Sequence, residues 1–201
     1  MAGLTRVYLE VGSKRTFASA AGWPGWCRSG KDEALALENL AAYGPRYLKV
    51  AKLAKLSIPD RPSFQVVERL KGNATTDFGA PGIPARDEAR RQPPAESKRM
   101  IALLEACWKY LDTVRARAPE ELRKGPRGGG RDREKMYQHV LDSEVGYAPA
   151  IGLRLKQPDR GALLEAIRKP ASGTKWPVPY AVRRIAWHAL DHAWEMEDRL
   201  P

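Results

Sequence analysis

The fold of this chain is decided by its C-terminal stretch, VRRIAWHALDHAWEMEDRL, which spans residues 182–200. An α-helix has 3.6 residues per turn, so side chains three or four positions apart share one face. At that spacing, one face of the stretch carries Ile185, His188, His192, Met196 and Arg199. The pattern predicts a long helix that turns this face towards the protein interior.

The same half of the chain contains three more stretches with helical periodicity. They cover residues 97–118, 132–147 and 162–169, and the last is closed by Pro170. The first of them has an apolar face formed by Ile101, Leu104, Cys107, Trp108, Leu111 and Val114. Four helices with one amphipathic face each predict an antiparallel four-helix bundle.

The N-terminal half has a different pattern. Residues 5–11, TRVYLEV, alternate between apolar and polar positions, which is typical of a half-buried strand. Two more strands are expected over residues 14–20 and 63–72. Between them, residues 34–56 have helical spacing, and Gly44-Pro45 interrupts it. These elements predict a small α+β unit.

The chain as a whole is therefore predicted to belong to the α+β class. The small domain is expected over residues 1–72 and the helical bundle over residues 97–201. Residues 73–96 are rich in Gly, Pro and charged side chains, so they are expected to link the two.

The histidines suggest a metal site. The chain has only three, His139, His188 and His192, and all fall on predicted inward helix faces. His188 and His192 lie one helical turn apart, which is how a helix presents two nitrogen ligands to one metal. Neutral imidazole suits zinc, nickel, copper or iron(II), and three such ligands leave an open position, as in catalytic sites. The alternative is that the histidine pair merely packs in the core or on the surface.

The C-terminal half resembles a known family in these features. The bundle order, the histidine in YQHVLDSE (137–144) and the pair in RRIAWHALDHAWEMEDR (183–199) are similar to the DinB/YfiT-like metalloproteins. The resemblance implies a divalent metal, such as Zn, Ni or Fe, held by His139, His188 and His192. It also implies a small-molecule substrate, with chemistry by thiol transfer, isomerisation or metal-assisted hydrolysis, and is compatible with a homodimer.

The N-terminal half resembles a second family. Residues 15–43, RTFASAAGWPGWCRSGKDEALALENLAAY, are similar to the HicB-like antitoxin fold, with a strand, a Pro-Gly turn, a second strand and a helix. The DNA-binding appendage of such antitoxins has no visible counterpart here. The resemblance therefore implies a role in packing, oligomerisation or shaping the site.

Several polar residues lie near the proposed ligands. Asp142 and Glu195 each follow a ligand by three positions, so they are candidates for proton transfer or for orienting a ligand. The alternative interpretation is that both are ordinary carboxylates that are solvated or paired with a basic residue. Asp191, which is close to His188, is expected to pair with an arginine. Arg154 is a candidate for holding the carboxylate of a low-molecular-weight thiol. Cys27, beside Trp26, is a candidate exposed thiol.

Composition and charge limit the classes of partner and the cellular location that the chain can have. The net charge is +11, but it is spread as +5 over residues 1–90 and +6 over the rest, so nucleic acid is not the favoured partner. Nucleic-acid or protein binding with a structural metal remains the alternative function. The N-terminus lacks the apolar run of a signal peptide, and no stretch reaches the ~18 apolar residues of a membrane span. A cytoplasmic protein with reduced cysteines is expected.

Overall fold

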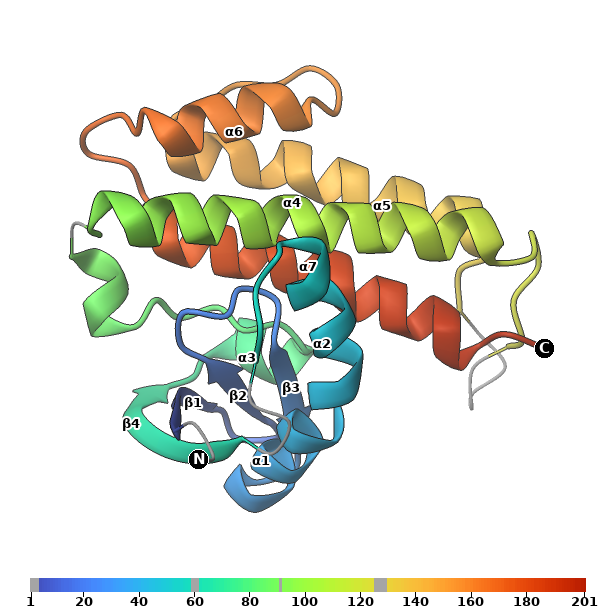
Figure 1. The fold of residues 1–201 in the computed structure, drawn as a ribbon, viewed down its shortest axis with the longest axis horizontal. Helices are drawn as coiled ribbons and strands as arrows, with labels where there is room; N and C mark the ends of the chain where they lie inside the picture. Colours follow the sequence, from blue (N-terminus) through green and yellow to red (C-terminus); the bar gives the residue numbers. More distant parts are fainter. Residues whose placement is uncertain (1–3, 59–61, 91, 125–129) are drawn as a thin grey trace.

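The α+β class predicted from the sequence is confirmed. The computed structural model describes residues 4–58, 62–90, 92–124 and 130–201. Within these ranges the chain forms one four-stranded sheet and seven α-helices. In Figure 1, the sheet and the helices next to it lie on one side of a pair of long helices, and two further helices lie on the other side.

The sheet contains the three predicted strands and one more. Its spatial order is β3-β2-β1-β4, with β1 antiparallel to β2 and parallel to β4. The additional strand, β3, was implied by the HicB-like resemblance. The strands are β1 (Leu4–Val11), β2 (Thr16–Ala20), β3 (Cys27–Gly30) and β4 (Ser63–Lys71).

Two helices, α1 (Glu33–Ala42) and α2 (Gly44–Leu53), are present where one interrupted helix was expected. The first packs on β2 and β3, and the second packs on the long helix that begins at Pro94. The Asp32 side chain caps α1 by accepting a hydrogen bond from the backbone N–H of Leu35. Because Pro45 fits only the first turn of a helix, the chain ends α1 and starts α2 at this point. The predicted interruption is confirmed.

Residues 73–96, predicted as a linker, contain two short helical elements and make specific contacts. These elements are α3 (Ala74–Phe78) and the 3-10 turn η1 (Arg86–Ala89). The buried carboxylate of Glu10 in β1 accepts hydrogen bonds from the backbone N–H groups of Gly82 and Ile83. The segment is therefore bonded to the sheet.

All four helices predicted for the C-terminal half are present. The long α4 and α7 run side by side, with α5 and α6 on the side away from the sheet (Figure 1). In α7, 15 of 21 residues are buried, which makes this helix the centre of the structure. The helices are α4 (Pro94–Arg117), α5 (Arg133–Tyr147), α6 (Arg160–Arg168) and α7 (Val178–Asp198), with a 3-10 turn η2 (Ala148–Ile151) after α5.

One hydrophobic core runs through both halves of the chain. Apolar side chains from the sheet, α1 and α2 join those of α4, α5, α6 and α7 in a single cluster. None of the described helices is long and apolar enough to cross a lipid bilayer.

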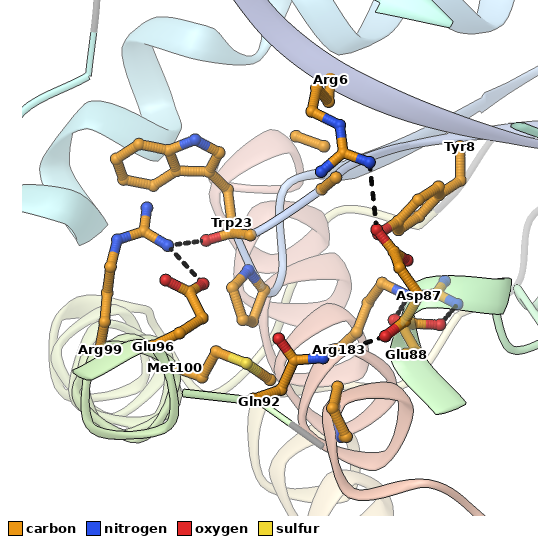
Figure 2. Close-up of a pocket in the computed structure, with 15 residues that line it drawn as sticks. Arg6, Tyr8, Trp23, Asp87, Glu88, Gln92, Glu96, Arg99, Met100 and Arg183 are labelled. Atoms are coloured by element: carbon orange, nitrogen blue, oxygen red, sulfur yellow. Dashed lines mark hydrogen bonds and ion pairs between the residues drawn. The ribbon is translucent and has the colours of Figure 1, made fainter. Parts of the chain in front are cut away.

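A buried ion pair fastens η1 to α7. The guanidinium of Arg183 donates to both carboxylate oxygens of Glu88, over Nε–Oε1 and Nη2–Oε2 distances of 2.6 and 2.9 Å (Figure 2). Both side chains are at most 7% exposed. Arg183 also donates to the carbonyl oxygen of Ile83, 3.0 Å away. Removing one member of such a pair leaves an uncompensated buried charge.

We therefore predict that Arg183→Met lowers the free energy of unfolding by about 3–5 kcal/mol, as measured by urea denaturation. The double variant Arg183→Met, Glu88→Leu should recover most of this loss, because both charges are removed together. As a control, Arg6→Gln breaks the exposed Arg6–Asp87 pair of the same region and should cost under about 1 kcal/mol. An Arg183→Met protein as stable as wild type would contradict the anchoring role.

Candidate metal centre

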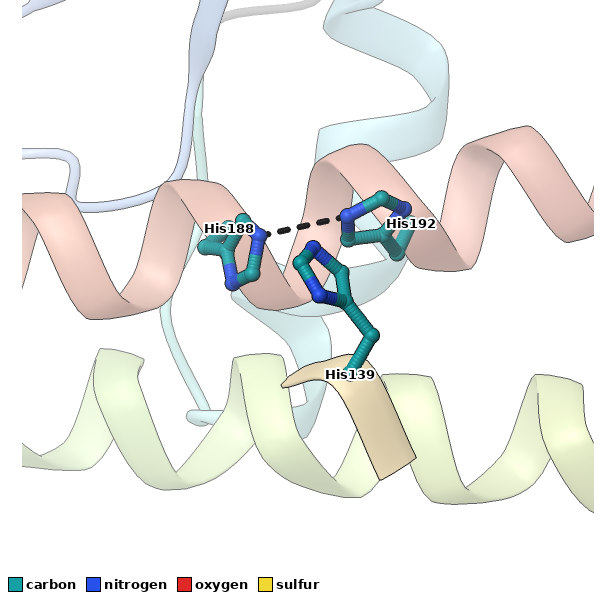
Figure 3. A group of neighbouring side chains, drawn as sticks. All are labelled: His139, His188 and His192. Carbon is teal, nitrogen blue, oxygen red and sulfur yellow. Dashed lines mark hydrogen bonds between the residues drawn. The ribbon is translucent and has the colours of Figure 1, made fainter. Parts of the chain in front are cut away.

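The two histidines of α7 face one another across a short gap. Their Nε2 atoms lie 3.2 Å apart, and their ring centroids are 4.7 Å apart (Figure 3). Both residues are nearly enclosed, with 7% of His188 and 9% of His192 exposed. Two nitrogens bound tetrahedrally to one zinc ion at about 2.0–2.1 Å are roughly 3.3 Å apart. The gap therefore has the size that a shared metal ion requires.

The third imidazole comes from α5. His139 lies between Met136 and Val140, both buried, and these apolar contacts hold α5 against the core. Its ring centroid is 5.0 Å from that of His188 and 5.0 Å from that of His192 (Figure 3). One ring nitrogen from each histidine lies within 4.8 Å of the other two. The three predicted ligands thus converge and can hold a metal ion.

Glu195 orients one of these ligands. Its Oε2 lies 2.9 Å from Nδ1 of His192, so the carboxylate favours the tautomer in which Nδ1 carries the proton. Nε2 of His192 then carries no proton, so it can accept the hydrogen bond from Nε2 of His188 or bind a metal in its place. Hydrogen bonds from His192 and Arg199 lower the pKa of Glu195, which keeps its carboxylate ionised. A carboxylate that fixes a ligating histidine in this way is common in metal sites.

Arg199 supports Glu195 from the end of α7. Its Nη1 lies 3.2 Å from Oε1 of Glu195, and its guanidinium also donates to the carbonyl oxygens of Arg123 and Arg131. The sequence pattern predicts that Arg199 lies on the inward face of the helix, but it did not lead us to predict a partner for this residue. Its spacing of four residues from Glu195 was the signal that could have revealed the pairing.

The surroundings keep two of the imidazoles neutral. Burial, followed by the charge of the neighbouring histidines, lowers the pKa of His188 to about 2. Burial and Arg131 lower the pKa of His139. Metal ligation requires imidazole without its second proton, so both residues are ready to bind at neutral pH. Nδ1 of His188 is buried and has no hydrogen-bond partner among the described residues.

The remaining predicted residues lie outside this cluster or have other partners. Asp142 is exposed on α5 and accepts a hydrogen bond from Gln138. Arg154 is exposed between η2 and α6 and has no hydrogen bond or ion pair to the described part of the chain. Asp191 pairs with an arginine, as expected, and that partner is Arg28 of β3 at 2.9 Å. The roles predicted for Asp142 and Arg154 stay predictions.

Both cysteines are buried free thiols. Cys107 lies in the core, as expected, but the suggestion that Cys27 is exposed is wrong. Cys27 opens β3, and its sulfur accepts a hydrogen bond from the hydroxyl of Ser19. Burial raises the pKa of Cys27 to about 12, so its thiol is protonated and unreactive at neutral pH.

Comparison with family models, with curated proteins and with solved structures found no match to this chain. The candidate site therefore has to be interpreted from its own geometry.

We predict that Glu195→Ala weakens zinc binding about 10–100-fold, because His192 loses the partner that orients it. Glu195→Gln keeps a hydrogen-bond acceptor and should have a smaller effect. Chelator competition measures both affinities. Glu165→Ala, which removes an exposed carboxylate of α6, is the matched control and should bind zinc like wild type. Equal affinity in Glu195→Ala and the control would contradict the orienting role.

The metal-free protein should lose stability in mild acid. Because the pKa of His188 is lowered in the folded state, the unfolded chain takes up its proton first as pH falls below about 6.5. Unfolding is thus favoured on acidification, by about 1 kcal/mol from this residue between pH 7.0 and 5.5. Urea denaturation at the two pH values measures the loss, which His188→Gln should reduce by that amount. An equal pH dependence in both proteins would contradict the buried neutral imidazole.

Proposed function

We propose that this chain is a divalent-metal-dependent enzyme that acts on a small molecule. The proposal is carried by the convergence of one ring nitrogen each from His139, His188 and His192 within 4.8 Å. The metal would be Zn, Ni or Fe, since imidazole ligands suit all three. A site with three protein ligands leaves room for one more group, which is the arrangement of catalytic rather than structural zinc.

The exposure of the cluster supports a catalytic site. His188 and His192 are buried on α7, whereas His139 is only partly buried on α5. The cluster is therefore closed on the side of α7, and His139 is the ligand most exposed to solvent. A purely structural site is usually closed by a fourth protein ligand, and no further Cys, Asp or Glu joins the cluster among the described residues.

The residues of the site would have two roles, metal binding and the positioning of a ligand. The three histidines bind the metal, and Glu195 with Arg199 holds His192 in its ligating tautomer. A metal in such a site acts as a Lewis acid and lowers the pKa of a coordinated water or thiol. Glu195 is a positioning residue in this scheme, because its carboxylate is already engaged by His192 and Arg199.

Two reaction classes fit this site. In one, a low-molecular-weight thiol is the nucleophile and the reaction is a transfer or an isomerisation. In the other, water is the nucleophile and the reaction is a hydrolysis. The resemblance of residues 97–201 to the DinB/YfiT-like family supports both classes equally. The buried, protonated Cys27 and Cys107 supply no reactive protein thiol, so the thiol of the first class has to be a co-substrate.

Metal analysis and an activity screen test the proposal together. Wild-type protein, stripped with chelator and reloaded with Zn²⁺, Ni²⁺ or Fe²⁺, should bind about one ion per chain. It should then turn over either activated esters or an electrophile in the presence of glutathione, mycothiol or bacillithiol. His188→Ala should lose both the ion and the turnover, whereas Lys169→Gln, an exposed change just after α6, should keep both.

The outcomes separate the alternatives. An unchanged metal content in His188→Ala would show that the site is wrong. A stoichiometric metal with no turnover of any substrate class would favour a binding or regulatory protein with a structural metal.

A further inference from the structure

A cavity of about 690 Å³ lies beside the candidate metal centre, between the small sheet and the C-terminal half of α7. One wall comes from β2 and β3. The other includes Trp187, Asp191 and Glu195, which are spaced four residues apart along α7. This row lies next to the row of His188 and His192, and the hydrogen bond from His192 to Glu195 joins the two. The cavity therefore runs alongside the metal ligands.

The cavity has an excess of positive charge. Each of its three carboxylates is already engaged by a side chain: Asp191 by Arg28, Glu195 by His192 and Arg199, and Asp198 by Arg46 and Tyr43. The basic residues that line it are Arg15, Arg28, Arg123, Lys124 and Arg199.

Two of these arginines have no carboxylate partner among the described residues. Among the described residues, Arg15 makes no ion pair, and the Arg123 side chain donates only to the backbone carbonyl of Asp198. Charges gathered in a cavity with apolar walls attract a ligand of opposite sign more strongly than charges on an open surface. The two guanidinium groups are therefore suited to bind a carboxylate or phosphate.

Apolar rings complete the cavity. Phe17 of β2 and Trp187 of α7 are both buried and meet edge to face, with their ring centroids 5.9 Å apart. Only 2% of Phe17 and 4% of Trp187 is exposed, and these small exposed parts line the cavity where a ligand can place a hydrocarbon or aromatic group. The volume lies within the range of cavities that hold small organic molecules.

A second cavity, of about 370 Å³, differs from the first because its positive charges are balanced by carboxylates. It lies where β1, η1, α4 and α7 meet (Figure 2). Its three arginines each have a carboxylate partner: Arg6 with Asp87, Arg99 with Glu96, and Arg183 with Glu88. These pairs leave it without the cationic excess of the larger cavity.

We propose that the 690 Å³ cavity binds a small organic anion, the carboxylate or phosphate of which is held by Arg15 and Arg123. The apolar part of the anion lies against Phe17 and Trp187. The further step, that this anion is the substrate of the metal centre, rests on the proposed function. In this arrangement the small N-terminal unit supplies one wall of the substrate pocket.

Calorimetric titration with phenylphosphonate, an aromatic anion that resists hydrolysis, tests the binding. Metal-free wild-type protein should bind it saturably, and at least tenfold more tightly than uncharged acetophenone. The double variant Arg15→Gln, Arg123→Gln should bind it at least tenfold more weakly. Arg6→Gln, which removes an arginine from the smaller cavity, is the matched control and should bind like wild type. Arg15→Lys, Arg123→Lys keeps the charge but loses the planar guanidinium fork, so its affinity should lie between those of wild type and the double glutamine variant.

Three results would overturn the proposal. They are no saturable binding to wild type, equal affinity for the uncharged compound, and undiminished affinity in the double glutamine variant. If the glutamine variant is misfolded by circular dichroism, a fall in wild-type affinity between 50 and 300 mM NaCl supports the proposal, and a salt-independent affinity overturns it.

A metal measurement separates this inference from the proposed function. The double glutamine variant should keep the zinc content of wild type, because among the described residues neither arginine side chain forms a hydrogen bond with a histidine. Conversely, His188→Ala should lose zinc and still bind phenylphosphonate. Binding of phenylphosphonate that requires zinc and ignores both arginines would place the anion on the metal alone and overturn the cavity as its site.

Discussion

Burial of α7 is the constraint on which the rest of the structure depends. A helix enclosed by a sheet on one side and helices on the other cannot leave its charged groups to water, so these groups are stable only when they pair within the protein. Arg183 forms an ion pair with Glu88 in η1, and Asp191 forms one with Arg28 in β3. His192 forms a hydrogen bond with Glu195 of the same helix. The first contact joins the segment of residues 73–96 to the helix, and the second joins the sheet to it. The same helix therefore anchors the sheet and presents two of the three candidate ligands.

The electrostatic setting of the histidines explains what kind of ligand the centre would favour. Nearby cations, Arg184 and Arg131, contribute to the low pKa of His188, and the same charges oppose the binding of a metal cation. Glu195 offsets part of this repulsion through His192. An anionic group at the open position would offset more of it. An anion bound in the cationic cavity beside α7 would supply such a group, so the proposed anion and the metal would favour the binding of one another.

Much of the architecture could be predicted from periodicity, because helices and strands impose spacings of 3.6 and 2 residues on apolar side chains. The ligand positions followed from the same argument, since residues 188 and 192 must share a face of α7. Other features depend on contacts between distant parts of the chain. The pairing of Arg28 with Asp191 spans 163 residues. The burial of Cys27 depends on how α7 and the sheet meet, and no local pattern encodes either of these contacts. The spacing of three residues made both Glu195 and Asp142 candidates for orienting a histidine, but Glu195 bonds His192 whereas Asp142 bonds Gln138, and side-chain rotamers decide that difference.

The central claim is that the three histidines bind one metal ion. A crystal structure of the zinc-loaded protein, with anomalous data on both sides of the zinc absorption edge, tests it most directly. The account predicts a single anomalous peak about 2.0–2.1 Å from one nitrogen each of His139, His188 and His192. A protein that takes up zinc elsewhere, or that crystallises from zinc with no peak among these nitrogens, would contradict it.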